Sequence, residues 1–205
     1  MPGLKALWPK VARLLGLRGG EADALRRLLE ALVEEGQMGY EQALRACGPD
    51  EEAATEAILM AYELGAISPK APGQACLEWD ASSLGPGSQL AINPAVEKAL
   101  RALSEGRGVE EALVELFSEL GAPDWQAEAL ALVSLELAGR EHVSGSDVAS
   151  SCRSHGLEGF ESASVAILKG AGIISPVLAS TWPSGDARYR ACRFLWVLWR
   201  ALSEP

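Results

Sequence analysis

The chain has 205 residues, of which 48% are hydrophobic and 22% charged, and its formal net charge is -10 at pH 7. This composition is typical of a folded globular protein and is too apolar for a disordered one. The acidic balance argues against a protein that wraps nucleic acid, which needs a basic surface, and no apolar run approaches the roughly 20 residues that span a bilayer.

The sequence contains two related halves. The matched segments are VARLLGLRGGEADAL at 11–25 with LFSELGAPDWQAEAL at 116–130, ELGAISP at 63–69 with GAGIISP at 170–176, and RALSE at 101–105 with RALSE at 200–204. Three matches in the same order indicate a duplicated unit of about a hundred residues. We therefore predict two domains, 1–106 and 107–205, each long enough to bury its own core. With 10 basic and 15 acidic residues in the first and 8 and 13 in the second, each carries -5.

Four helices are predicted at the start of the first half. Apolar residues recur at helical spacing from Leu4 to Leu15. The fourth helix opens at Pro49 and Asp50 and closes at Gly65, which are typical start and stop signals. The predicted helices are residues 4–15, 21–35, 39–46 and 49–65.

The residue pattern changes after the fourth helix. Residues 66–94 are rich in Gly, Pro and Ser, with short stretches that favour strands around the turn LGPGS. We predict a β-hairpin of residues 74–80 against 88–92. Pro94 then begins a closing helix that runs to about Ser104.

The second half repeats this order with a shorter hairpin. Its first four helices are predicted at residues 109–120, 125–138, 145–153 and 159–169. The hairpin pairs residues 177–182 with 188–192 around PSGD, and a last helix follows at 194–203. The predicted fold class is mainly α with small β-hairpins, an α+β arrangement.

The order of helix, short helix, helix, strand and hairpin resembles a winged helix-turn-helix unit with an extra helix at each end. The resembling residues are GAISP at 65–69 and GIISP at 172–176. In that superfamily, a glycine at the end of the recognition helix leads into the first strand of the wing. The resemblance implies a tandem winged-helix protein. The alternative is an all-α repeat with ordered loops in place of the wings.

The sequence has no recognisable metal or disulfide pattern. The four cysteines, at positions 47, 76, 152 and 192, include no C-x-x-C pair, and two histidines are too few for a zinc site. Cys152 and His155 are three residues apart, a spacing more typical of chance than of chemistry in an isolated pair. We expect reduced, mostly buried thiols, no metal or other cofactor, and, since the start of the chain has no signal-peptide pattern, a cytoplasmic protein.

No catalytic signature is present either. The sequence lacks the phosphate-binding loop G-x-x-x-x-G-K-[ST], a G-x-G-x-x-G after a strand, H-E-x-x-H and G-x-S-x-G. Ser144, Ser146 and Ser154 lie near the histidines in sequence, but they fit helix starts and turns better than a Ser-His-acid arrangement. We therefore expect no enzyme activity.

Carboxylates gather where a winged-helix protein would place its groove-reading helix. In the first copy this helix carries Asp50, Glu51, Glu52 and Glu56. Facing a phosphate backbone, these acids would create a like-charge contact that costs several kcal/mol. They also favour the helix dipole, which accounts for them without any partner. Either interpretation argues against DNA binding through this copy.

The second copy contains the only dense basic segment of the sequence. It joins arginines to aromatic residues, at Arg188, Tyr189, Arg190, Arg193, Trp196, Trp199 and Arg200. Alternation along a strand puts the first two arginines on one face and the tyrosine on the other. These arginines would contact phosphates or an acidic partner by bidentate pairing, or cover the edge of the core and pair with acids of the other copy.

These features predict a non-enzymatic tandem winged-helix protein that binds another protein. In architecture and charge alone, it resembles the kleisin-associated partners of bacterial condensins. The predicted contact surfaces are the acidic helix of the first copy and the aromatic-basic segment of the second. The alternative is a transcriptional regulator that uses mainly the second wing on DNA, with a homodimer placing two wings side by side. No membrane partner is expected.

Overall fold

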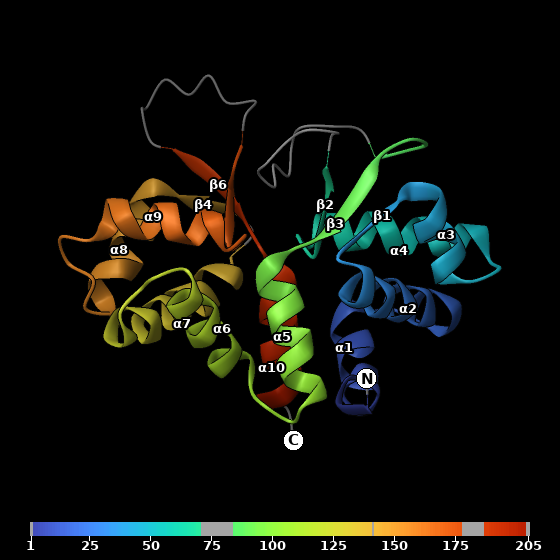
Figure 1. Cartoon of the computed structure of the whole chain (residues 1–205), viewed down its shortest axis with the longest axis horizontal. Coiled ribbons are helices and arrows are strands. Elements are labelled where there is room, and N and C mark those ends of the chain that lie inside the picture. Colours follow the sequence, from blue (N-terminus) through green and yellow to red (C-terminus); the bar gives the residue numbers. More distant parts are fainter. Residues whose placement is uncertain (1, 71–83, 141, 178–186, 204–205) are drawn as a thin grey trace.

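A computed structural model describes residues 2–70, 84–140, 142–177 and 187–203 of the chain (Figure 1). Within these ranges it shows ten helices and two small three-stranded antiparallel sheets. The predicted class, mainly α with small β elements, is confirmed. The all-α alternative is wrong, because both segments that contain ISP form strands.

The same order of elements occurs twice. The elements of residues 1–106 are α1 (Pro2–Leu15), α2 (Gly19–Glu35), β1 (Gln37–Gly39), α3 (Tyr40–Cys47), α4 (Glu51–Glu63), β2 (Ile67–Lys70), β3 (Gln89–Ile92) and α5 (Pro94–Ser104). Those of residues 107–205 are α6 (Val109–Glu119), α7 (Asp124–Ala138), β4 (His142–Ser144), α8 (Gly145–Ser154), α9 (Glu161–Gly170), β5 (Ile174–Pro176), β6 (Arg188–Ala191) and α10 (Arg193–Ser203). We refer to these two sets as the first and second repeats.

Local chemistry explains where the helices begin. The Asp50 carboxylate accepts a hydrogen bond from the Ala53 amide at 3.1 Å and caps α4. Asn93 caps α5 in the same way, through the Ala95 amide, and Pro94 occupies the first turn. The predicted helices agree with the structure to within a few residues, although Gly39 belongs to a strand and α9 begins at Glu161 instead of Gly159.

Each sheet has its central strand late in the repeat. The strand orders are β1-β3-β2 and β4-β6-β5. Because β3 is paired on one side with β1 and on the other with β2, the predicted pairing of 88–92 with 74–80 is wrong. Likewise β6 pairs with β4 and β5; Val177, the one residue of the predicted partner strand 177–182 in the described part of the chain, donates its amide to Arg188 O at 3.0 Å. Residues 74–80 and 178–182 lie outside the described part of the chain.

The two repeats pack against each other through their first and last helices. The first helix of each repeat contacts the last helix of the other, α1 with α10 and α6 with α5. Figure 1 shows α5 and α10 together at the centre, with the two sheets above them on either side. One hydrophobic core runs through both repeats and includes the fully buried Phe117 and Phe194. The repeats therefore bury a common core.

A buried amide joins the repeats where their sheets approach each other. The Asn93 side chain, 1% exposed, donates to the carbonyl of Gly65 at 2.9 Å and to that of Gly172 at 2.7 Å. Both glycines have positive φ, 72° and 76°. A Cβ at Gly172 would lie 2.7 Å from Asn93 Oδ1, so this position excludes a side chain for two separate reasons.

Residues just before and in α10 of the second repeat form hydrogen bonds with the C-terminal end of α4. Cys192, which corresponds to Asn93 in the RALSE match, donates its thiol to Gly65 O at 3.2 Å. The Phe194 amide donates to Leu64 O at 3.0 Å. Complete burial raises the pKa of the Cys192 thiol to about 12. The C-terminal end of α4 is therefore held by residues of the other repeat.

Substitution of Gly172 by Ala is expected to destabilise the protein more than the same change at Gly159. Both positions have positive φ, which costs Ala about 1–2 kcal/mol, but a Cβ at Gly159 meets nothing within 4 Å. At Gly172, displacement of Asn93 should add roughly 1–3 kcal/mol. Urea unfolding of the two variants measures the difference.

A double-mutant cycle isolates the contact. Asn93→Ala removes the amide donor to the buried Gly172 O and one of the two donors to the buried Gly65 O, and should cost about 1–3 kcal/mol by itself. It also removes the obstacle to a Cβ at Gly172, so the double variant should be less destabilised than the sum of the single variants. If the two losses of stability are strictly additive, the described contact between Asn93 and Gly172 is contradicted.

Candidate functional site

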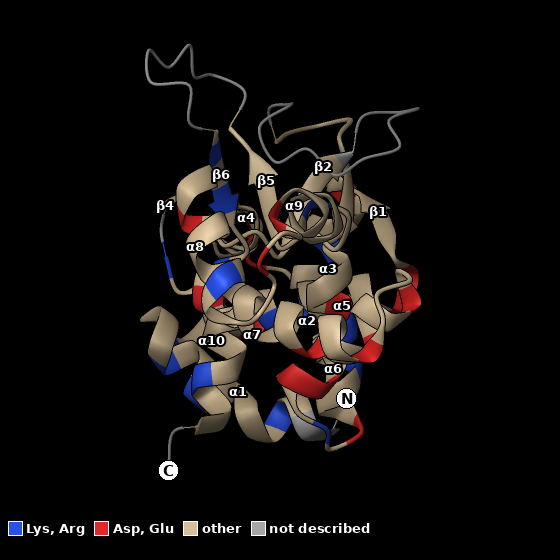
Figure 2. Cartoon of the chain, turned by 90° about the vertical axis from the view of Figure 1, so that its left-hand side faces the viewer, with Lys and Arg blue, Asp and Glu red and all other residues tan. Residues whose placement is uncertain are grey.

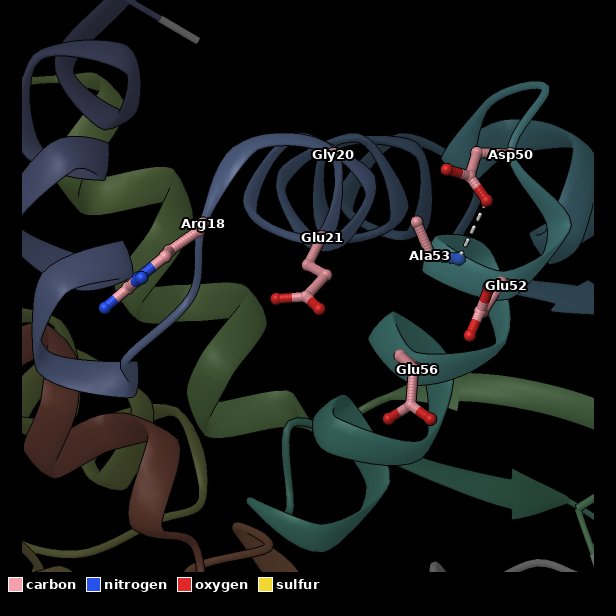
Figure 3. Close-up of a pocket in the computed structure, with 7 residues that line it drawn as sticks. All are labelled: Arg18, Gly20, Glu21, Asp50, Glu52, Ala53 and Glu56. Carbon is pink, nitrogen blue, oxygen red and sulfur yellow. Dashed lines mark hydrogen bonds between the residues drawn. The ribbon is translucent and has the colours of Figure 1, made fainter.

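Three of the predicted acidic residues line one hollow on the first repeat. The hollow has a volume of about 460 Å³ and lies between the start of α2 and the first turns of α4 (Figure 3). Its lining residues are Arg18, Gly20, Glu21, Asp50, Glu52, Ala53 and Glu56. The fourth predicted acid, Glu51, is exposed but does not line the hollow. Sequence reasoning missed Glu21 and Arg18, which a different helix and its N-cap supply.

The lining of this hollow is negatively charged. Asp50 is partly used in capping α4, whereas Glu52 and Glu56 are exposed one turn apart on the same helix. Figure 3 shows Glu21 facing the space between the two helices, with Arg18 on the far side of Glu21 from α4. Four carboxylates against one guanidinium favour a cationic group and oppose a phosphate.

The second repeat carries an aromatic pair at the equivalent place. Counting from the matched segments, Gly20 corresponds to Trp125 and Ala53 to Phe160. The Trp125 and Phe160 rings meet edge to face with centroids 5.6 Å apart, and the residues are 50% and 46% exposed. In the first repeat a Cβ at Gly20 would contact Ala53 Cβ at 3.8 Å, so the positions are also neighbours there. The repeats share this corner of the fold and differ in its chemistry.

The predicted basic segment is partly used inside the molecule. The Arg190 guanidinium lies over the ring of Tyr62 at 5.4 Å and donates to Glu63 O at 3.5 Å, both in the first repeat. Tyr189 is buried, while Arg188 and Arg193 are exposed. Figure 2 shows the arginine-bearing strand β6 in blue in the upper part of the fold. Of the two alternatives predicted for this segment, contact with the other repeat is observed at Arg190, where it is made to a ring and a carbonyl.

The predicted tryptophans occupy different surroundings along α10. Trp196 is half-buried, with the Arg200 guanidinium 5.7 Å from its ring centre. It also covers Gly139, where a Cβ would lie 3.1 Å from the indole ring. Trp199 instead lines a groove between α6, α7 and α10.

The structure does not bring the acidic and the basic candidates into one site. Arg190 contacts Tyr62 and Glu63 at the C-terminal end of α4, whereas the carboxylates are at its N-terminal end. A helix of 13 residues separates these ends by roughly 20 Å. The protein therefore has several distinct surfaces.

The serines near the histidines serve local structure. Ser144 forms a capping box with Asp147, Ser146 bonds to the Ser144 hydroxyl, and the Ser154 hydroxyl donates to Ser151 O. His155 Nε2 lies 3.2 Å from Glu136 Oε2, which also accepts from the Ser151 hydroxyl at 2.6 Å.

The cysteines show no sign of activation where the structure describes them. Cys47, Cys152 and Cys192 are free and buried. Burial raises the pKa of each thiol, to about 11 for Cys47. Within the described ranges no group of three His, Cys, Asp or Glu side chains is placed to hold a metal ion. None of the helices in those ranges combines the length and apolar character needed to cross a bilayer.

The fold and its surfaces define a protein of two fused α+β repeats with a common core and unlike exteriors. A protein-family model matches residues 10–194, which extend over both repeats, and the chain belongs to that family. No curated protein matches the chain. No solved structure matches it either.

Acidification is expected to destabilise the fold partly through Glu136. The hydrogen bond from Ser151, assisted by His155 and Arg140, lowers the pKa of Glu136 below its ordinary value of 4.5. A carboxyl with a lowered pKa stabilises the folded state fully above that value, and the contribution is lost as pH falls through the lower folded pKa.

Glu136→Gln should therefore lower stability at pH 7 and weaken the pH dependence below pH 4.5. Glu128→Gln is the matched control, since Glu128 is an exposed carboxylate of the same helix. Denaturant unfolding, measured at intervals of about one pH unit between pH 3 and pH 7, tests both effects. An unchanged pH profile in Glu136→Gln would show that this network does not contribute.

Proposed function

We propose that this chain is a non-enzymatic adaptor of two winged-helix repeats that binds another protein in the cytoplasm. The observation that carries the proposal is the exposed group of carboxylates at the start of α4, beside a hollow lined mainly by acids. A DNA-reading winged helix would present this end of the helix to phosphates. Here the same end is suited to a cationic protein surface.

The topology supports a winged-helix assignment for each repeat. The order α2-β1-α3-α4-β2-β3, with a three-stranded antiparallel sheet, recurs as α7-β4-α8-α9-β5-β6. The third helix of such a unit, α4 or α9, is the one that enters the major groove in DNA-binding relatives of this fold. The resemblance concerns the arrangement of the elements and leaves the partner to be inferred from the surface.

Electrostatics favour a protein partner over DNA. A duplex carries about one negative charge per 1.7 Å, so its affinity depends on cations that neutralise phosphates. The helix α9 contributes Lys169 in its last turn, but Glu161 in its first turn has the opposite charge. Arg190 is engaged with Tyr62 and Glu63. DNA binding through the second wing remains the alternative and would rest on the exposed Arg188 and Arg193.

The state of the thiols supports the proposed compartment. Three cysteines, Cys47, Cys152 and Cys192, are free and buried. Unpaired thiols inside a core are typical of proteins in a reducing compartment.

Generic duplex DNA should not bind the chain at physiological ionic strength. The net charge of -10 and the acidic start of α4 both oppose a polyanion. A titration followed by fluorescence anisotropy, from about 50 to 150 mM salt, tests this expectation. Binding that weakens steeply with salt and disappears in Arg188→Ala with Arg193→Ala would support the regulator and contradict the adaptor.

Charge reversal at the hollow should abolish binding of the protein partner. The tagged full-length chain is purified from its native host, and a stoichiometric partner is identified and re-bound in pure form. Glu52→Lys with Glu56→Lys should weaken that complex about tenfold or more, because it places like charges against a cationic surface.

The matched control is Glu34→Lys with Glu35→Lys, which makes the same change of charge at exposed positions ending α2. This control should bind as the wild type does, and both variants should unfold at similar urea concentrations. Failure to find a stoichiometric partner, or equal weakening in the two variants, would count against the proposed surface.

A further inference from the structure

A larger groove lies on the second repeat between α6, α7 and α10. We call it the acidic groove, and its volume is about 900 Å³. Its lining residues are Arg107, Gly108, Val109, Glu110, Glu111, Val114, Glu115, Glu128, Leu132, Trp199, Leu202 and Ser203. Trp199 belongs to the predicted aromatic-basic segment, but the groove as a whole is separate from the acidic hollow on which the proposed function rests.

Apolar side chains are accessible in the acidic groove. Leu132 on α7 and Leu202 on α10 are 41% and 44% exposed, which places them among the most exposed large apolar residues described. Val114 and Trp199 lie half-buried beside them. Scattered exposed leucines need no explanation, but several that line one groove indicate a contact surface.

Carboxylates surround these apolar side chains. Glu110, Glu111 and Glu128 have no ion-pair partner among the residues that the structure describes. Glu115 differs, since it pairs with Lys98 at 3.0 Å and with Arg107 at 2.9 Å. Three carboxylates are therefore left to interact with cations of a ligand.

The first repeat does not have this surface. By the RALSE match, Trp199 and Leu202 correspond to Leu100 and Leu103, which are 0% and 5% exposed. By the match of 11–25 with 116–130, extended toward the N-terminus, Glu110 and Glu115 correspond to Lys5 and Lys10. The fold alone does not require the exposed apolar floor, since its counterparts Leu100 and Leu103 are buried, and it does not require acids at Glu110 and Glu115, since the other copy has lysines there.

We propose that the acidic groove binds a cationic amphipathic helix from a protein partner. A helix with an apolar stripe would cover Leu132, Trp199 and Leu202, and Lys or Arg beside the stripe would meet the free carboxylates. This proposal rests on the proposed adaptor function and adds the chemistry of one partner segment.

A second copy of the chain is a poorer occupant. Its basic N-terminal helix α1, with Lys5 and Lys10, already buries Leu4, Trp8 and Val11 in its own core. Docking of α1 would bring cations to the groove without an apolar face to cover the leucines. The partner helix is therefore expected to come from another protein.

The test uses the full-length chain and labelled synthetic peptides. The probe is a helix of leucine and lysine, roughly 18 residues long, with leucines at helical i, i+3, i+4 and i+7 spacing. One comparison peptide has the same composition in an order that spreads the leucines around the helix. The other replaces every lysine by glutamate. Only the first peptide is expected to bind at physiological salt.

Two pairs of variants locate the binding site. Leu132→Ser with Leu202→Ser should weaken binding of the amphipathic peptide about tenfold or more, whereas Leu59→Ser with Leu120→Ser should have no effect, since those residues are 40% and 47% exposed elsewhere. Glu111→Lys with Glu128→Lys should weaken it similarly. Its control, Glu41→Lys with Glu35→Lys, also changes one first-turn and one other exposed carboxylate.

Several outcomes would overturn the proposal. These are no binding of the amphipathic peptide, equal binding of the reordered peptide, and equal weakening by a variant and its control. A dimer in sedimentation that Leu132→Ser with Leu202→Ser dissociates would assign the groove to a second copy instead. If the peptide fails but the native partner still depends on Glu52 and Glu56, this inference fails and the adaptor survives. If the peptide binds but no stoichiometric partner is found, the groove keeps its proposed ligand and the adaptor function loses its support.

Discussion

The side chain of Asn93 connects the two repeats, and the arrangement of the whole molecule depends on this contact. One buried amide donates to carbonyls of both Gly65 and Gly172, which have positive φ and follow the ends of α4 and α9. A buried polar group is tolerated only when its hydrogen bonds are made, so the amide specifies one register between the repeats. That register allows α1 to pack on α10 and α6 on α5, and it closes a single core.

The contacts between the repeats at Asn93 and Cys192 also determine which surfaces face outward. Because Cys192, Phe194 and Arg190 hold the C-terminal end of α4, the acidic start of that helix is presented to solvent at the far end. Both repeats have the glycine turn at this junction, Gly65 in one and Gly172 in the other, and they differ in the side chains around it. An acidic hollow in one repeat corresponds to an exposed aromatic pair in the other. The two repeats thus share one core and differ in their exteriors.

Local signals predicted the helices well, because start signals such as the cap Asp50 and the first-turn Pro94 act within a few residues of their position. The three-residue strands β1 and β4 are too short to show a period of two, so their role as partners of β3 and β6 was not predictable. The acids of α4 were found as a cluster along one helix. Glu21, the use of Arg190 on Tyr62 and the groove at Trp199 all depend on contacts between distant segments, which no local pattern records.

Both repeats are expected to fold and unfold as one unit, held together by the Asn93 hydrogen bonds and the common core. Hydrogen exchange in increasing urea tests it most directly, at the amides of Leu25 in α2 and Leu130 in α7, which are matched and fully buried positions. Both amides should exchange with the same free energy of opening and the same dependence on urea. Two separate free energies, with one repeat open while the other stays protected, would contradict it.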